Sequence, residues 1–373
     1  MRRSASLKML FHERATALGS IAGVVAIIFL VGQQLAILFG LLSYMSFLVD
    51  NSGADIWIKT QNTNNFNASG TIPMSYRDRV MGVEGIEWAE PVVIGAGLVK
   101  LKNGNFQAAQ IFGTRRPHLV GGPTRFYQGS IDGLLDGEGV TVDKLDLATL
   151  DFPKIGDIFE INNKRARVTA ITQGMQGFSG FILYTNIEKA RELVSMSTDR
   201  CSNVLIKVKD GTKIEEMRLL LQQILPKAEV IATPKLSKQT RLYYLQNTGI
   251  GSSFGLTTII ATIVGVVVIS LTMYTNVLNK TKDYAVLRAL GARKIDVLYI
   301  VFLQAMYIAI IGIFVGFTLL SMFLFFTKDS GLPSYLPWWM PIVHALGTIL
   351  LCILGSTIAM RRAVSIEPAT AFR

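Results

Sequence analysis

The chain has 373 residues, of which half are apolar and 17% are charged, and its formal net charge is +11. This composition is too apolar for one soluble domain and too polar for a bundle that lies wholly within a bilayer. It predicts membrane spans combined with a water-soluble domain. The basic residues are dispersed over several short flanks, so the positive charge does not indicate binding to nucleic acid.

Four hydrophobic runs predict four membrane-spanning helices in a one-plus-three arrangement. Each exceeds or approaches roughly 20 residues, the length that crosses a bilayer as a helix, and the runs are residues 15–49, 242–279, 297–327 and 341–360. Because a helix rises about 1.5 Å per residue, the first two would be about 50 Å long, against a hydrocarbon layer of about 30 Å. We therefore expect both to continue beyond the bilayer as stalks. The first also exceeds the roughly 7 to 15 residues of a signal-peptide core, so we expect it to be retained.

The distribution of charge predicts the orientation. The insert 50–241 carries 24 of the 37 basic and 21 of the 26 acidic residues, whereas the rest of the chain carries 13 basic and 5 acidic residues. The basic excess lies at 1–14, 280–296 and 361–373, and the positive-inside rule assigns such segments to the cytoplasm. We therefore expect the protein to lie in a bacterial inner membrane with both termini in the cytoplasm. The insert and the short loop 328–340 then face the periplasm or the cell exterior.

The insert is predicted to contain a split βαβ lobe. Residues 203–209 alternate apolar and polar as a strand does, a helical apolar stripe follows a cap at Thr212, and 229–232 return as a strand. A matching helix at 74–81 and strand at 86–93 would complete the lobe.

A second, β-rich lobe is predicted from short strand-like runs between turn residues, at 107–112, 158–161 and 167–171. The expected fold is thus an α-helical membrane protein with an inserted α+β extracytoplasmic domain. Cys201 lies in the insert and Cys352 in the fourth span, so no intrachain disulfide is expected to hold this domain together.

The loop between the second and third spans carries the sharpest motif. Its residues 282–294 read Lys-Asp-Tyr-Ala-Val-Leu-Arg-Ala-Leu-Gly-Ala-Arg-Lys, in which Asp283 suits a helix start and Gly291 a helix end. The pattern predicts a short amphipathic helix at the cytoplasmic surface of the membrane. An interfacial anchor is the alternative interpretation.

This run resembles the coupling segment of the MacB/FtsX/LolC family of ABC transporter permeases, which has the form E-[IV]-[AG]-[VI]-[LM]-[RK]-A-[LI]-G-[AM]. Residues 361–373 resemble the closing P-x-x-A-L-R of that family, and the insert length and residues 82–91 are similar to those of DevC-like exporter permeases. Asp283 and Tyr284 depart from the Glu and the β-branched residue that are common in the family. The resemblance implies a MacB-like periplasmic core domain at 50–241 and an FtsX-like permease domain at 242–373. It also implies a set of residues that contact an ATPase: Lys282, Asp283, Tyr284, Leu287, Arg288, Ala289, Leu290, Gly291 and Ala292.

No G-x-x-x-x-G-K-[ST] motif occurs in the chain, so it lacks the usual loop that cradles nucleotide phosphates. The resemblance implies instead a non-catalytic permease without a cofactor or metal of its own. It would work as a homodimer with two copies of an ABC ATPase, which bind ATP and Mg²⁺, and would transmit their closure mechanically to the outer domains. The spans lack paired acidic and basic residues, which disfavours ion-coupled secondary transport.

Two further groups of residues are candidates for specific roles. Small-xxx-small spacing, which allows close helix contact, predicts a dimer seam at Gly19, Gly23, Gly251 and Gly255, although glycine is also common in membrane helices without such a role. Residues near the predicted outer boundary form a candidate site for a ligand such as haem, although Tyr and Met are also routine at interfaces. These residues are Tyr44, Met45, Tyr243, Tyr244 and His344.

The leading prediction is an exporter permease for an amphiphilic or periplasmic substrate. It would be embedded in membrane lipid, and a periplasmic adaptor and an outer-membrane channel are further candidate partners. The alternatives are FtsX-like transmembrane signalling to a cell-wall hydrolase, lipoprotein extraction and haem export. The near-neutral charge of the insert does not discriminate among them.

The orientation is testable by thiol labelling of a variant without native cysteines. We expect Lys164→Cys to react with a membrane-impermeant maleimide in intact spheroplasts, and Lys282→Cys to react only after the membrane is permeabilised. Labelling of Lys164→Cys only after permeabilisation would reverse the topology.

Overall fold

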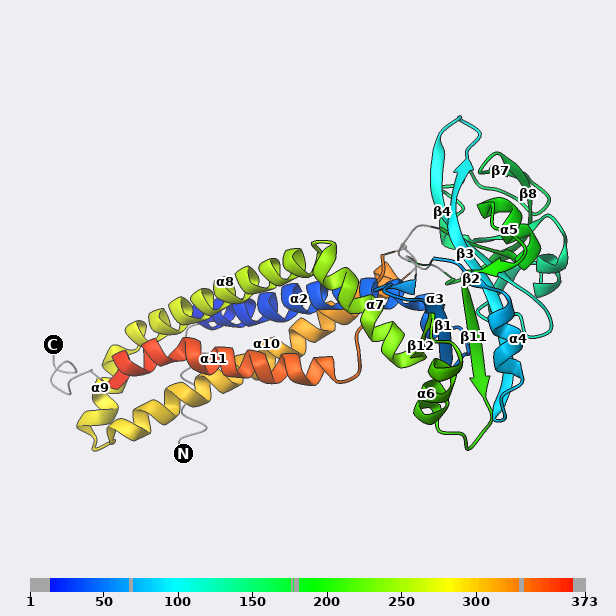
Figure 1. Ribbon diagram of the computed structural model, residues 1–373. Coiled ribbons are helices and arrows are strands. Elements are labelled where there is room, and N and C mark those ends of the chain that lie inside the picture. Colours follow the sequence, from blue (N-terminus) through cyan, green and yellow to red (C-terminus); the bar gives the residue numbers. More distant parts are fainter. Residues whose placement is uncertain (1–13, 67–69, 176, 178–180, 329–331, 365–373) are drawn as a thin grey trace. The chain divides into compact units, whose positions relative to one another are not determined.

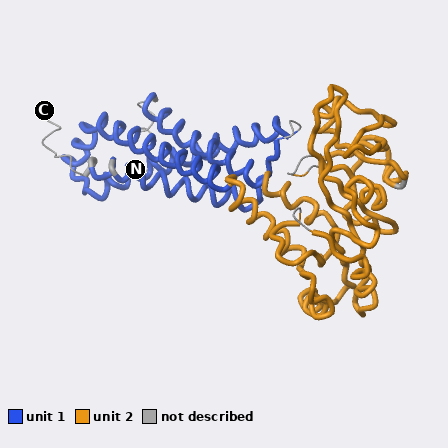
Figure 2. The backbone as a smooth tube through the Cα atoms, turned by 45° about the horizontal axis from the view of Figure 1, so that its top comes forward, with its two compact units in different colours: residues 1–40, 251–373 blue, residues 41–250 orange. Residues whose placement is uncertain are grey.

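The computed structural model describes residues 14–66, 70–175, 177, 181–328 and 332–364. It divides into two compact units, which are coloured separately in Figure 2. Unit 1 comprises the described residues of 1–40 and 251–373, and unit 2 comprises those of 41–250. Unit 1 is helical, whereas the described strands all belong to unit 2.

Four long helices carry the hydrophobic runs (Figure 1). They are α2 (Arg14–Met45), α8 (Ile250–Asn279), α10 (Lys294–Thr327) and α11 (Met340–Val364). Each is long and apolar enough to cross a membrane, so the prediction of four spans is confirmed. A short helix, α9 (Thr281–Ala289), lies between α8 and α10 in the chain.

Glycines let α2 approach its neighbours closely within unit 1. A Cβ added at Gly312 of α10 would lie 2.6 Å from Cβ of Val24 on α2. One added at Gly265 of α8 would collide with the side chain of Ile27, also on α2. Since larger side chains do not fit these separations, small residues set the packing of α2 against both α8 and α10.

Unit 2 is built on a mixed sheet with helices on both faces. Its helices are α3 (Phe47–Asp50), α4 (Ser75–Met81), α5 (Ile187–Val194), α6 (Ile214–Ile224) and α7 (Thr233–Asn247), with 3₁₀ turns η2 (Ile131–Leu135) and η3 (Lys144–Asp146). Its strands are β1 (Ile56–Thr60), β2 (Ile72–Pro73), β3 (Ile86–Lys100), β4 (Phe106–Thr114), β5 (Phe126–Gln128), β6 (Gly139–Asp143), β7 (Ile158–Ile161), β8 (Lys164–Thr172), β9 (Phe181–Asn186), β10 (Arg200–Cys201), β11 (Asn203–Val208) and β12 (Ala228–Ala232).

The first lobe of unit 2 has the order β12-β1-β11-β3, with each strand antiparallel to its neighbour. Two interleaved units, β1-α4-β3 and β11-α6-β12, produce this order, which is the split βαβ arrangement. The predicted lobe is therefore confirmed. Strand β1 shows why it forms: Ile56 and Ile58 pack with residues of α4 and α6, whereas Trp57 packs on the opposite face with residues of α3 and α7.

The second lobe continues from the same long strand. The C-terminal half of β3 pairs with β4, which pairs in parallel with β9, and the sheet continues through β6, β8 and β5. Strand β7 pairs with both β3 and β8, and α5 packs its apolar face on β3 and β4. The strands predicted at 107–112, 158–161 and 167–171 all lie in this lobe, as β4, β7 and β8.

Two details differ from the sequence-based expectation. The N-cap of α6 is Lys213 rather than Thr212, because the turn at Asp210-Gly211 continues through Thr212, whose N–H donates to the carbonyl of Lys209 at 3.1 Å. The run 242–279 is also not one helix. Thr248 and Gly249 separate α7 from α8, and Gly249 adopts a φ of +73°, a left-handed conformation that ends regular helix.

The close packing of α2 predicts a strong effect of bulk at one glycine. We expect Gly312→Val to lower the apparent melting temperature of the detergent-solubilised protein by several degrees, because overpacking costs about 1–3 kcal/mol. Gly347→Val is the matched control on α11, since its Cβ would meet no atom within 4 Å. Equal melting temperatures for the two variants would contradict the packing of α2 on α10.

Candidate functional site

The strongest candidate site is α9 with the turn that follows it, a segment outside the uncharged runs of the spans. Its C-terminal end is closed by backbone hydrogen bonds: Gly291 N–H donates to Arg288 O at 3.1 Å, and Ala292 N–H donates to Leu287 O at 3.0 Å. This is a Schellman motif, and Gly291 supplies the left-handed residue with a φ of +99°. The predicted helix and its glycine end are thus present.

The start of α10, like the end of α9, is fixed by hydrogen bonds between residues close in the chain. Arg293 is its N-cap, and the backbone N–H of Arg293 donates to Asp296 Oδ2 at 3.0 Å. Only three residues, Leu290, Gly291 and Ala292, therefore lie between the end of α9 and the cap of α10. The path of α9 relative to α10 is set by a short turn with satisfied backbone groups.

Tyr284 attaches α9 to α10 through a buried polar contact. Its side chain is fully buried, and its hydroxyl donates to Gln304 Oε1 of α10 at 3.3 Å. Burial raises the pKa of Tyr284, so the hydroxyl stays protonated and remains a donor. Tyr284 belongs to a buried apolar cluster that includes Val297 and Ile300 of α10. A hydrogen bond in such an environment is costly to break because its partner stays desolvated.

The opposite side of α9 is exposed and partly apolar. The side chains of Val286, Leu290 and Ile295 are 47%, 81% and 64% exposed. Exposed Lys282 and Asp283 flank them on α9. We call Val286, Leu290 and Ile295 the α9 patch. Exposed apolar residues beside charged ones are typical of a surface that binds another protein or a membrane surface.

The predicted coupling residues divide between these two sides. Those that are exposed are Lys282, Asp283, Ala289, Leu290 and Gly291, whereas Leu287, Arg288 and Ala292 are half-buried and Tyr284 is buried. Sequence reasoning missed Val286, Ile295 and Gln304. The spacing of four residues from Lys282 through Val286 to Leu290 was the available signal for the exposed side.

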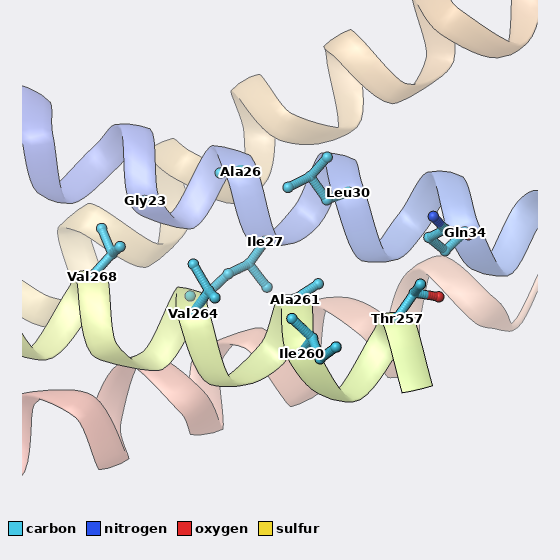
Figure 3. A pocket seen from close by; sticks show the side chains of 11 residues that line it. Gly23, Ala26, Ile27, Leu30, Gln34, Thr257, Ile260, Ala261, Val264 and Val268 are labelled. Atoms are coloured by element: carbon cyan, nitrogen blue, oxygen red, sulfur yellow. The ribbon is translucent and has the colours of Figure 1, made fainter. Parts of the chain in front are cut away.

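The glycines predicted for a dimer seam lie in different surroundings. A Cβ added at Gly23 would lie 2.9 Å from Val268 Cγ1 of α8, and one at Gly19 would lie 3.8 Å from Thr272 Cγ2. Gly19 and Gly23 thus face α8 of the same chain, and Gly23 also lines an apolar groove of about 370 Å³ between α2 and α8 (Figure 3). Gly255 would meet no atom within 4 Å. The dimer seam at these four glycines stays a prediction.

The residues predicted to bind a ligand at the outer boundary belong to both units. Tyr44 and Met45 end α2, and Tyr243 and Tyr244 lie on α7 with ring centroids 5.6 Å apart in an edge-to-face arrangement. His344 belongs to α11, and its ring lies 6.0 Å from that of Phe317. Among the described residues, no three His, Cys, Asp or Glu side chains form a group that would hold a metal ion. Ligand binding here stays a prediction.

The attachment of α9 to α10 can be tested by removing the hydroxyl group of Tyr284. We expect Tyr284→Phe to lower the apparent melting temperature, because the buried Gln304 carbonyl loses its donor at a cost of about 1–3 kcal/mol. Tyr299→Phe, at a partly exposed site on α10, should change it little. Equal stability of both variants would show that the Tyr284 hydrogen bond does not hold α9.

Comparison with known protein families gives two matches that together span most of the chain. Residues 15–224 match the MacB-like periplasmic core domain, and residues 255–368 match the FtsX-like permease C-terminal domain. The first match alone covers more than half of the chain.

One relative is an uncharacterized ABC transporter permease, MJ1507, from Methanocaldococcus jannaschii. It is 28% identical over 182 residues, which cover 44% of this chain and 42% of the relative, so the similarity spans less than half of that protein. Among solved structures, the periplasmic region of MacB from Actinobacillus actinomycetemcomitans has 15% identity and a TM-score of 0.40, with 50% of this chain and 93% of that chain covered. The extracellular domain of the noncanonic ABC-type transporter YknZ from Gram-positive bacteria has 11% identity and a TM-score of 0.36, with 48% and 99% covered.

Proposed function

Because the chain belongs to the ABC transporter permeases that combine a MacB-like periplasmic core domain with an FtsX-like C-terminal domain, we propose that it is the membrane subunit of an exporter driven by a separate ATPase. The α9 patch carries this proposal. It consists of exposed apolar side chains on α9, at its C-cap and in the first turn of α10, and Tyr284 on the other side of α9 is buried against α10. The basic residues around it favour a cytoplasmic location.

In this proposal the ATPase docks on the α9 patch. Leu290 is the central anchor because it is the most exposed of the three apolar side chains. ATP and Mg²⁺ bind in the partner, since the chain has no nucleotide-binding loop of the usual type. Two permeases and two ATPases form the working complex.

Movement of the docked ATPase passes first to α10 and α8. The Tyr284–Gln304 hydrogen bond and the short turn at Gly291 couple α9 to α10. Lys280, the N-cap of α9, directly follows Asn279, the last residue of α8. The chain then leads to the outer domain by two routes. Helix α2 is continuous from Arg14 to Met45, whereas α8 is separated from α7 by Thr248 and Gly249. One connection is therefore a continuous helix and the other is interrupted by two non-helical residues, which suits mechanical transmission.

The transported substrate is an amphiphile or a molecule taken from the periplasmic side, with an adaptor and an outer-membrane channel as further partners. Signalling to a cell-wall hydrolase, lipoprotein extraction and haem export use the same ATP-driven movement with different outer partners. A hydrolase, a lipoprotein or haem that copurifies with the intact complex would identify the corresponding alternative.

The docking role is testable with the ATPase that copurifies with this chain. We expect Leu290→Asp to weaken its association at least about 30-fold, the effect of losing an interface residue worth about 2 kcal/mol. The permease-dependent part of ATP hydrolysis should fall in parallel. The measurements are pull-down and ATP turnover of the complex in nanodiscs.

Phe152→Asp serves as the matched control, because Phe152 is also a highly exposed apolar residue but lies in unit 2. It should leave association and turnover unchanged. Full association and turnover in Leu290→Asp would contradict docking on the α9 patch.

A further inference from the structure

Helix α7 of unit 2 is flanked by two open grooves of about 620 Å³ each. The first groove is lined by Leu42, Asp50, Thr233, Pro234, Ser237, Lys238, Arg241, Leu242 and Leu245. The second is lined mainly by polar groups of α7 and shares Lys238 and Leu242 with the first. Lys238 and Leu242 therefore line both grooves.

The charge of this surface is positive. Helix α7 carries Lys235, Lys238 and Arg241 and no acidic residue. Arg241 is neutralised, because its Nη2 lies 2.5 Å from Asp50 Oδ2 and its Nε donates to Ser46 Oγ at 2.7 Å. Lys235 and Lys238 are exposed, and neither forms an ion pair with any residue that the structure describes.

The acidic groups of the grooves do not oppose an incoming anion. Asp50 is held by Arg241, as above, and by Ser46, whose hydroxyl donates to Asp50 Oδ2 at 2.7 Å. Glu229, in the second groove, lies 2.6 Å from the buried ammonium group of Lys59. Both carboxylates are thus paired, and the lysines of α7 dominate the local field.

Apolar and aromatic side chains accompany these lysines. Leu42, Leu242 and Leu245 line the first groove, and the side chain of Leu242 is 42% exposed. Tyr243 lines the second groove. Lysine, leucine and tyrosine side by side are typical of the boundary between membrane and water, where each presents a polar tip and an apolar body.

The chain connects this surface directly to two candidate spans. Leu42 belongs to the candidate span Ala15–Met45. Asn247, the last residue of α7, is three residues from Ile250, the first residue of the next candidate span. At about 3.8 Å between consecutive Cα atoms, the end of α7 lies within about 11 Å of that span.

From the two lysines without an ion pair, the adjoining leucines and the chain connections to the candidate spans, we propose that the α7 grooves bind an anionic phospholipid of the outer-facing leaflet. Lys235 and Lys238 contact its phosphate, and Leu42, Leu242 and Leu245 contact the upper part of its acyl chains. This lipid site goes beyond the proposed function, because it requires neither the ATPase nor a transported substrate.

The test is photo-crosslinking of the full-length protein at the site. A benzoylphenylalanine replaces the exposed Gln246 on α7, and the protein is reconstituted in nanodiscs of equimolar phosphatidylglycerol and phosphatidylcholine. Mass spectrometry then identifies the lipid in each adduct. We expect phosphatidylglycerol adducts to predominate by about fivefold for each contributing lysine, the equivalent of about 1 kcal/mol per basic residue near an anionic surface.

The double variant Lys235→Gln/Lys238→Gln should bring the ratio of the two lipids close to one. The matched control Lys102→Gln/Lys154→Gln changes the charge equally at two other exposed lysines of unit 2 and should retain the preference. A ratio near one in the protein with its native lysines, an unchanged preference in the double variant, or adducts with protein in place of lipid would each overturn the proposal.

Discussion

The hydrocarbon of a bilayer offers no hydrogen-bond partner, so a chain that crosses it must satisfy its backbone within each helix. This constraint confines irregular backbone in unit 1 to the ends of the long helices. The break at Lys280 and the turn at Leu290–Ala292 lie at such ends, and they isolate α9 as a separate helix. Because Gly291 and Asp296 satisfy the backbone of that turn locally, α9 needs no neighbour to close its end. Its exposed side is therefore available to a partner.

The contacts of the buried side of α9 explain one departure from the family pattern, Tyr284. Tyr284 stands where a β-branched residue is common in related coupling segments. A valine or isoleucine side chain has no hydrogen-bond donor, whereas the tyrosine hydroxyl reaches the Gln304 amide beside a buried apolar cluster. In this chain the contact between α9 and α10 therefore includes a specific hydrogen bond in addition to apolar packing. In a permease that works by mechanical transmission, such an attachment makes α9 and α10 respond together.

Much of the architecture follows from local patterns. The four spans were predictable because about 20 uncharged residues in a row have few alternatives to a membrane helix. Strand β11 of the split βαβ lobe was predictable because apolar and polar residues alternate along it, whereas β1, in which Ile56, Trp57 and Ile58 are all apolar and all buried, was not predicted. The end of α9 was predictable from Gly291.

Features that depend on distant partners were not predictable in the same way. The order β12-β1-β11-β3 joins segments more than 100 residues apart, and no local pattern encodes it. Small-xxx-small spacing does not say which helix it faces, so Gly19 and Gly23 gave no sign of packing on α8 of the same chain. Hydropathy carries no information about backbone dihedrals, so the break between α7 and α8 at Gly249 was not predicted. The role of Tyr284 required knowledge that Gln304 lies opposite it.

The central claim is that α9 is the surface through which an ATPase acts on this permease. Hydrogen–deuterium exchange of the full-length chain, alone and in complex with its copurifying ATPase, measures this most directly. We predict slower amide exchange over residues 281–292 in the complex. A stable complex in which exchange over 281–292 is unchanged, with protection elsewhere in the chain, would contradict the account.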